Sequence, residues 1–250
     1  MSPSIRTLAR WILILCDPRK LLSWKYIPRY IIHWRRFSST SGQPLRLADS
    51  YPCLADWVSA TPYDPHYFYQ GGWLARRIAS ARPGFHVDVG SSVQTLSVLS
   101  AQVPTVFVDY RPLNARLDNL ICLGGNIESL PFADASLQSL SCMHVVEHIG
   151  LGRYGDPLDP AGAAKAVGEL SRVLAPGGKL YLTAPVGRER VCFNAHRVFS
   201  PHTFQKLMPG LTLKEFSWVG DDGAFNEHGE QADAAGLDYG CGLYIFEKTQ

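Results

Sequence analysis

Aspartate and glycine residues follow two strand-like runs of the sequence at a spacing that suits a nucleotide-like ligand. Asp88 and Gly90 stand near the end of "FHVDVG", and Asp109 ends "TVFVD". An acid about 20 residues past a glycine turn can accept hydrogen bonds from both hydroxyls of a ribose. We therefore consider these residues a candidate cofactor site, with a solvated or capping aspartate as the alternative interpretation of Asp109.

A second group of residues is suited to act as a base. Glu147 and His148 follow the run "LQSLSCM" (137–143), and His196 lies in "RERVCFNAHR" (188–197). A histidine or a carboxylate within hydrogen-bond reach of a hydroxyl can remove its proton. Glu147, His148 and His196 are therefore the candidate catalytic residues. An "EH" pair that only orders its loop is the alternative interpretation.

The segment 188–197 also contains groups that can hold an acceptor. Arg188, Arg190 and Arg197 lie within ten residues of one another, and Asn194 stands between them. Guanidinium groups bind phosphate or carboxylate in a bidentate geometry. We assign Arg188, Asn194 and Arg197 as candidate substrate-binding residues, with a solvated basic face as the alternative.

The cysteines give no sign of a metal site or of disulfides. The six are scattered without a CxxC pair, and several lie in apolar runs, where a reduced cysteine behaves as a small hydrophobe. No His, Asp or Cys cluster in the sequence has the spacing of metal ligands. We expect no metal and a reducing, cytoplasmic compartment.

The main part of the sequence alternates strands with helices. Strands are expected at 86–90, 105–109, 120–125, 137–143, 179–185, 211–219 and 241–248, and helices at 63–80, 93–101, 159–174 and 201–208. This alternation implies right-handed crossovers and a largely parallel sheet, with ligands at the carboxyl ends of the strands. The residues expected at those ends are Asp88, Gly90, Ser91, Asp109, Asn126, Met143, His144 and Pro185.

Residues 1–36 form a basic and apolar arm. They carry eight Lys or Arg residues and one Asp, a local charge of +7 that leaves −5 for the rest of a chain whose net charge is +2. Bases interleaved with "WILILC", "LLSW" and "YIIHW" are typical of a helix on an anionic membrane surface, and an arm packed on the main domain is the alternative. No apolar run approaches the roughly 20 residues of a spanning helix. Nucleic acid is not expected as a partner, because the main domain is not basic.

Composition and a candidate linker predict the domain organisation. With 46% hydrophobic and 18% charged residues, the 250 residues suffice for one large α/β domain. The Ser, Gly and Pro residues of "SSTSGQP" (38–44) predict a linker. We therefore expect an arm with its linker at 1–44 and a main domain at 45–250.

Residues 129–185 resemble the class I S-adenosylmethionine-dependent methyltransferases. The shared pattern runs from "LPF" through a strand followed by "EH" to "ELSRVLAPGG" and a strand that ends in proline. The wider resemblance covers about 63–248. The runs "HVDVGS", "EHIGLGRYGDPLDP" and "GKLYLTAPVGRERVCFNAHRVF" resemble more closely the group called domain of unknown function two-six-eight. The resemblance implies an α/β fold with a seven-stranded, mostly parallel, doubly wound sheet (a Rossmann-like methyltransferase fold), here with an N-terminal helical arm.

The resemblance also implies S-adenosyl-L-methionine as the cofactor and a role for each residue at the strand ends. The corresponding positions are Asp88, Gly90 and Ser91 in the cofactor turn, Asp109 on the ribose, Asn126 and Ile127 beside the adenine, and Met143 and His144 beside the methionine portion. Ser92 replaces the second glycine of the family's turn, a change that a negative φ would tolerate. At Asn126 an acid is usual in the family.

We therefore expect a methyltransferase that acts on an oxygen of a small-molecule or glycan-type acceptor. The arm suggests that this cytoplasmic protein attaches peripherally to the inner face of a membrane. A catalytically inactive methyltransferase-like binding module, or a membrane-surface scaffold, is the alternative.

Overall fold

The computed structural model describes residues 18–43 and 45–249 of the protein. Contacts within the chain divide it into two units between Pro62 and Tyr63. This division falls later than the boundary after residue 44 that the sequence predicts. The first part of the expected arm, residues 1–17, lies outside the described residues.

The N-terminal unit is helical over much of its described part. A 3₁₀-helix, η1 (Pro18–Tyr26), leads into α2 (Ile27–Ser41), and a short 3₁₀ turn, η2 (Leu47–Asp49), follows. Helix α2 ends at Gly42, whose φ of 63° is typical of a helix C-terminus.

The predicted linker overlaps with the last turn of α2. The hydroxyl groups of Ser39 and Thr40 donate to the carbonyl of Arg36 at 2.9 and 2.8 Å. Because these bonds point back along the helix, they are compatible with helical backbone. The Ser-rich segment therefore starts as helix and leaves it only at Gly42.

Apolar and basic side chains share the surface of α2. Ile31, Ile32 and Phe37 are exposed, and the exposed Arg35 and Arg36 stand between them in the sequence. Among the described residues, no helix is long and apolar enough to span a bilayer. Attachment of residues 1–36 to an anionic membrane surface stays a prediction.

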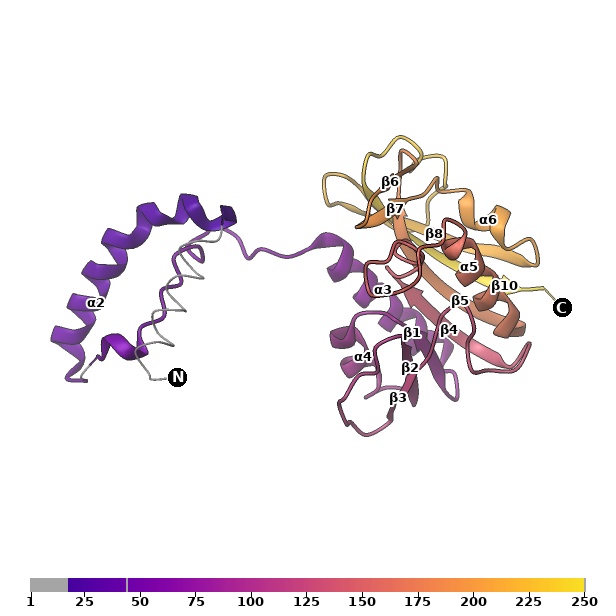
Figure 1. Cartoon of the computed structure of the whole chain (residues 1–250), viewed down its shortest axis with the longest axis horizontal. Coiled ribbons are helices and arrows are strands. Elements are labelled where there is room, and N and C mark those ends of the chain that lie inside the picture. Colours follow the sequence, from indigo (N-terminus) through magenta and orange to yellow (C-terminus); the bar gives the residue numbers. More distant parts are fainter. Residues whose placement is uncertain (1–17, 44, 250) are drawn as a thin grey trace. The chain divides into compact units, whose positions relative to one another are not determined.

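The larger unit is an α/β domain with a central sheet of eight strands (Figure 1). The strands of this sheet are β1 (His86–Val89), β2 (Thr105–Asp109), β3 (Leu120–Gly124), β4 (Leu137–Met143), β5 (Leu174–Val186), β8 (Leu211–Val219), β9 (Phe225–Asn226) and β10 (Gly240–Lys248). The helices are α3 (Pro65–Ala81), α4 (Val93–Leu99), α5 (Gly162–Val173) and α6 (Thr203–Leu207). A separate two-stranded sheet consists of β6 (Arg190–Cys192) and β7 (His196–Val198).

The sheet is doubly wound, as the sequence predicts. Its strand order is β3-β2-β1-β4-β5-β10-β8-β9. Strands β1 to β5 run parallel, and β10 is antiparallel to both β5 and β8. All seven expected strands are present, and the two-residue β9 extends the edge as an eighth. The order reverses between β1 and β4, which places a crevice at the carboxyl ends of these strands.

Helices cover both faces of the sheet and bury two apolar clusters. On one face, Leu170 of α5 and Phe204 of α6 pack in a cluster with Leu182 of β5. On the other face, Trp73 of α3 and Leu96 of α4 belong to the second cluster. Successive strand residues point to opposite faces, so the central strands contribute to both clusters.

Helix α3 begins at the cap that the sequence predicts. Asp64 Oδ1 accepts hydrogen bonds from the backbone N–H groups of His66 and Tyr67 at 2.9 and 3.3 Å. Pro65 occupies the first helical position, where it has no hydrogen bond to lose. The rings of His66 and Tyr67 both pack against His144, which follows β4. The cap therefore fixes two aromatic side chains at the carboxyl end of the sheet.

Two segments differ from their predicted structure. The segment 188–197, which lies outside the expected helices and strands, contains β6 and β7, which pair from Arg190 with Val198 to Cys192 with His196. The segment 175–178, which follows the helix expected at 159–174 and precedes the strand expected at 179–185, belongs to β5, and the register with β4 shifts there. The residues of β5 between Leu174 and Lys179 outnumber those that face them on β4, so the strand is irregular there. Proline and glycine, as in Pro-Gly-Gly, are typical of such irregular positions.

Asp64→Ala will lower the free energy of unfolding of the larger unit by about 1 kcal/mol, because two N–H groups at the start of α3 lose their acceptor. Asp64→Asn keeps an oxygen in the same place and is the matched control, with stability near that of the wild type. Urea denaturation followed by circular dichroism measures both variants. Equal stabilities of the alanine and asparagine variants would contradict the role of the cap.

Candidate functional site

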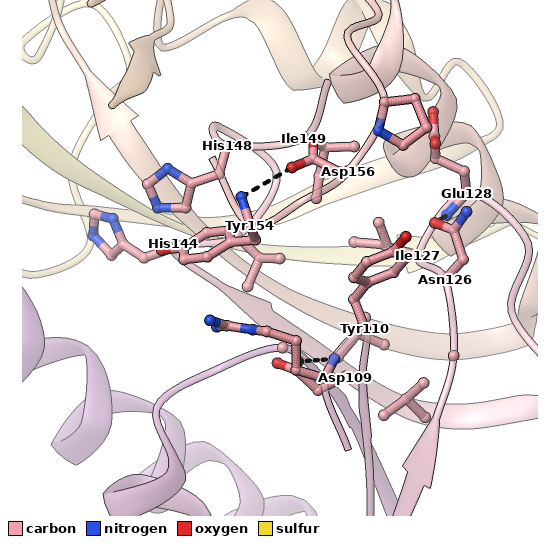
Figure 2. A pocket seen from close by; sticks show the side chains of 17 residues that line it. Asp109, Tyr110, Asn126, Ile127, Glu128, His144, His148, Ile149, Tyr154 and Asp156 are labelled. Carbon is pink, nitrogen blue, oxygen red and sulfur yellow. Dashed lines mark hydrogen bonds between the residues drawn. The ribbon is translucent and has the colours of Figure 1, made fainter. Parts of the chain in front are cut away.

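A pocket lies at the carboxyl ends of β1, β2 and β4, beside the loop after β3 (Figure 2). Its volume is about 120 Å³. The pocket is lined by Val89, Gly90, Val108, Asp109, Tyr110, Arg111, Gly125, Asn126, Ile127, Glu128, His144, Val145, His148, Ile149, Tyr154, Asp156 and Pro157. It stands where the strand order reverses, the usual place for a ligand in a doubly wound sheet.

The structure brings part of the predicted site together around this pocket. The predicted residues that line it are Gly90, Asp109, Asn126, Ile127, His144 and His148. The predicted residues outside its lining are Asp88, Ser91, Met143, Glu147, Arg188, Asn194, His196 and Arg197. The first group comes from four different strand ends, as the parallel sheet requires.

The turn after β1 carries the backbone past the pocket. Gly90 has a φ of 71°, and a Cβ at this position would lie 3.0 Å from Val145 Cγ1. Glycine is therefore the residue that fits this turn without strain. Ser92 has a φ of −62°, the negative value that lets a serine replace the family's second glycine. Its hydroxyl donates to Gln94 Oε1 at 2.9 Å.

The side chain of Asp88 holds this turn through hydrogen bonds. Its fully buried carboxylate accepts hydrogen bonds from the Ser91 N–H at 3.1 Å and from the Ser141 hydroxyl. Ser91 Oγ in turn accepts the Met143 N–H at 3.0 Å. Burial raises the pKa of Asp88 to about 6, although its hydrogen bonds act in the opposite direction. Asp88, Ser91 and Met143 thus connect the turn with β4 instead of lining the pocket.

Asp109 and Asn126 each use one side-chain oxygen to hold a turn. Asp109 Oδ1 accepts the Arg111 N–H at 2.7 Å, and Asn126 Oδ1 accepts the Glu128 N–H at 3.0 Å. Both side chains line the pocket (Figure 2). The remaining groups are an acceptor, Oδ2 of Asp109, and a donor, Nδ2 of Asn126.

His144 has an unusual backbone conformation at the end of β4. Its φ is 54°, a value that is uncommon outside glycine and that often marks functional sites. Its Nδ1 lies 2.8 Å from Glu147 Oε1, and its Nε2 lies 3.2 Å from Cys241 Sγ. Burial lowers the pKa of His144, but Cys241 and the Glu147 carboxylate outweigh burial and hold the pKa well above its usual value. Glu147 is itself buried, and its contact with His144 gives it a positioning role.

The His148 side chain lines the pocket, and its Nε2 lies 3.6 Å from Glu147 Oε1. Its Nδ1 lies 2.6 Å from the carbonyl of Ala195 and 3.2 Å from Arg153 Nη1. We assign the proton to Nδ1, because a lone pair would repel the carbonyl oxygen at that distance. Burial lowers the pKa of His148, so the neutral ring with an unprotonated Nε2 prevails at neutral pH.

Arg197 points inward from β7. Its guanidinium is largely buried and donates to the carbonyl of Ile149 at 2.6 Å and to that of Glu147 at 3.4 Å. Its backbone N–H also donates to the Glu147 carbonyl, at 3.0 Å. This placement gives Arg197 a structural role, holding the loop after β4, and its contact with a substrate stays a prediction.

The other predicted acceptor residues, Arg188 and Asn194, and the catalytic candidate His196 stand on the β6–β7 hairpin or just before it. Arg188 is exposed and pairs with Asp238 at 3.2 Å, and Asn194 is also exposed. His196 packs against the ring of Tyr239 at a centroid distance of 5.0 Å, and burial lowers its pKa. These side chains lie outside the pocket lining, so their contact with an acceptor stays a prediction.

Residues of the loop 150–158 line the pocket without having been predicted. The guanidinium of Arg111 lies 4.5 Å from the ring centroid of Tyr154, a cation–π contact between two lining residues. Asp156 Oδ2 accepts the Gly150 N–H at 2.7 Å and so folds the loop back on itself. A single tyrosine among the glycines of "GLGRYGDP" is the signal that could have indicated this loop.

Comparisons with known proteins agree with this architecture. Residues 132–234 match the model of the family described as Caenorhabditis protein of unknown function, DUF268. The N-methyltransferase NodS from Bradyrhizobium japonicum WM9, solved with S-adenosyl-L-homocysteine, aligns at a TM-score of 0.52 and 16% identity over 75% of this chain and 89% of its own. The larger unit has the class I methyltransferase fold.

A second methyltransferase structure shares this fold. A protein from Galdieria sulphuraria, assigned as a sarcosine dimethylglycine methyltransferase, aligns at a TM-score of 0.52 and 16% identity over 73% of this chain and 86% of its own. A comparison with curated proteins finds no match. The resemblance to class I methyltransferases and to DUF268 that the sequence predicts is thereby confirmed, the latter over residues 132–234.

The buried carboxylate of this methyltransferase-like domain predicts a pH dependence of stability. The pKa of Asp88 is about 6 in the folded state and about 3.9 in an unfolded chain. Between these values the folded state holds a proton that the unfolded state has lost. The free energy of unfolding therefore falls as the pH rises through this window, by up to about 1.4 kcal/mol per pH unit.

Asp88→Asn removes this titration and keeps the shape of the side chain. We expect the stability of the variant relative to the wild type to increase from about pH 4 to about pH 6. Urea denaturation at several pH values measures the difference, with exposed Asp118→Asn as the control. Parallel stability curves for wild type and Asp88→Asn would show that Asp88 titrates normally.

Proposed function

We propose that this protein is an S-adenosylmethionine-dependent methyltransferase. The observation that carries the proposal is the position of Asp109, whose carboxylate lines the pocket at the end of β2. The neighbouring strand β1 ends in the Gly90 turn, so the glycine turn and the acid stand side by side. The presence of S-adenosyl-L-homocysteine in the NodS structure, which shares the fold, supports this assignment.

The residues around the pocket fit the parts of such a cofactor. Gly90 lets a ligand approach the backbone, and Asp109 Oδ2 would accept hydrogen bonds from the ribose hydroxyls. Asn126 Nδ2 would donate to a ring nitrogen of the adenine, beside the apolar Ile127. His144 would border the methionine portion. When bound, S-adenosylmethionine supplies a methyl group that is activated by a sulfonium.

Among the predicted bases, His148 is the best placed for catalysis. It lines the pocket, and its unprotonated Nε2 can take the proton of an acceptor hydroxyl as the oxygen bonds to the methyl carbon. Glu147 is engaged by His144, and His196 lies on the hairpin. We therefore give the base role to His148 and positioning roles to the other two.

We propose a hydroxylated small molecule or glycan as the acceptor. Aromatic rings gather next to His144: Tyr67 stacks on it at a centroid distance of 5.6 Å, and His66 links it to Tyr239. Such rings can pack against the apolar face of a sugar or of a flat small molecule. Arg188 is exposed and would hold an anionic substituent by exchanging its partner Asp238 for it.

Asp109→Ala will weaken the binding of S-adenosylhomocysteine by about 10- to 150-fold, because a charge-assisted hydrogen bond contributes roughly 1.5 to 3 kcal/mol. Calorimetric titration measures the affinity, with exposed Asp118→Ala as a control of equal charge change. Absence of binding to the wild-type protein would overturn the enzyme proposal and favour the cofactor-free binding module. Equal affinities of the wild type and Asp109→Ala would remove Asp109 from the site.

His148→Gln will lower kcat by about 100- to 10,000-fold, the usual contribution of a general base. The affinity for S-adenosylhomocysteine should stay near that of the wild type, since the lost group acts on the acceptor. Transfer of a labelled methyl group to acceptors found in a panel of hydroxylated compounds measures kcat. Added imidazole should restore part of the rate, and exposed His202→Gln should match the wild type. An unchanged kcat would exclude His148 as the base.

A further inference from the structure

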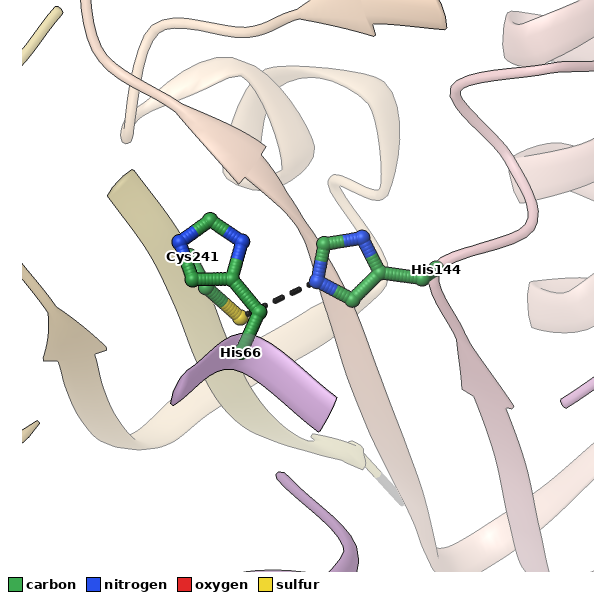
Figure 3. A group of neighbouring side chains, drawn as sticks. All are labelled: His66, His144 and Cys241. Atoms are coloured by element: carbon green, nitrogen blue, oxygen red, sulfur yellow. Dashed lines mark hydrogen bonds between the residues drawn. The ribbon is translucent and has the colours of Figure 1, made fainter. Parts of the chain in front are cut away.

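Three side chains with metal-binding atoms converge beside the pocket. His66 comes from the first turn of α3, His144 follows β4, and Cys241 lies at the start of β10 (Figure 3). One ligand atom from each lies within 4.8 Å of the other two. His144 Nε2 lies 3.2 Å from Cys241 Sγ. The cluster therefore combines two imidazoles and one thiol from three distant parts of the chain.

The separation between the His144 and Cys241 ligand atoms suits a small tetrahedral cation. Zinc bonds of about 2.0 Å to nitrogen and 2.3 Å to sulfur place tetrahedral ligand atoms roughly 3.3 to 3.6 Å apart. The His144–Cys241 distance is within a few tenths of an ångström of this range. The His66 nitrogen lies within 4.8 Å of the other two ligand atoms, and the partly buried ring has to move closer to them to complete the site.

Glu147 provides an independent indication of a ligand. Its carboxylate is 1% exposed, and Oε1 lies 2.8 Å from His144 Nδ1. Oε2 is buried and has no hydrogen-bond partner among the described residues, an arrangement that costs free energy unless charge nearby compensates it. A carboxylate that holds the outer nitrogen of a histidine is the usual second layer of a metal site, because it fixes the tautomer and directs the other nitrogen to the metal.

We propose that His66, His144 and Cys241 bind one zinc-type divalent cation, with Glu147 positioning His144. Two imidazoles and a thiolate are ligands that zinc prefers over magnesium or calcium. Three protein ligands leave a fourth position for water, which is the arrangement of catalytic zinc sites rather than of closed structural ones. The positive charge of the cation compensates the buried Glu147 carboxylate.

This proposal departs from the expectation of no metal, which stays untested. Positions 66, 144 and 241 form no short motif, so the sequence gives no spacing signal. The fold alone brings them together, through the cap of α3, the end of β4 and the antiparallel β10.

The full-length protein will retain about one zinc per chain after dialysis, as measured by elemental analysis. Cobalt substitution will give the intense visible bands of a tetrahedral site together with a sulfur-to-cobalt charge-transfer band, which requires the thiolate. Cys241→Ser will abolish the charge-transfer band, and His66→Gln will abolish stoichiometric retention. Glu147→Gln will weaken zinc about 10- to 100-fold in competition with a chelator, as expected for a positioning carboxylate.

Two matched variants control for the loss of a thiol or an imidazole elsewhere. Cys122→Ser in β3 and His202→Gln before α6 lie outside the cluster and will retain zinc like the wild type. If Cys241→Ser fails to fold, His66→Gln still tests the site. His66 is partly exposed, so its substitution should leave the fold intact. Failure of the wild type to retain zinc, or full retention by His66→Gln, would overturn the proposal. The readout needs no cofactor, so this result is independent of S-adenosylhomocysteine binding.

Discussion

The buried carboxylate of Asp88 connects the two strands between which the pocket lies. It accepts a hydrogen bond from the turn after β1, through the Ser91 N–H, and another from the Ser141 hydroxyl of β4. Ser141 also contacts a ring nitrogen of buried His86 at 2.8 Å. A buried carboxylate that loses its donors costs several kcal/mol. The turn at Gly90 therefore cannot shift against β4 without breaking this network, and the pocket keeps its shape.

A second set of contacts fixes the loop that follows β4. The carbonyl of Ala195 accepts from His148, and Arg197 donates to the carbonyls of Glu147 and Ile149. These hydrogen bonds fix the loop after β4 and the β6–β7 hairpin relative to each other. Residues 188–197, which the sequence singles out as acceptor-binding, contribute most clearly by setting the ring orientation of His148. A substitution in the hairpin can therefore alter the orientation of the His148 ring even when the substituted side chain does not touch His148.

The parts of the fold that the sequence predicts are those decided by local chemistry. Strands β2, β4 and β8 have the predicted bounds, because apolar and β-branched residues recur along each of them. The Asp64 cap is likewise local. Other features depend on contacts between segments that are distant in the sequence, and hydrophobic periodicity gives no information about such contacts. They are the burial of the Arg197 side chain and the convergence of His66, His144 and Cys241. The β6–β7 hairpin escaped prediction because "FNA" lacks the Asn-Gly or Asp-Gly signal of a tight turn.

The stacking of Arg111 on Tyr154 has a consequence for the rate at which a ligand enters. The pocket of about 120 Å³ is smaller than the roughly 300 to 1,000 Å³ of most ligand sites, and the pair lies among its walls. A ligand as large as the proposed cofactor therefore needs some of the lining side chains to move apart. If Arg111 and Tyr154 are among them, association is slower than diffusion by the fraction of time that the pair is open. The same contact then also slows the departure of the ligand.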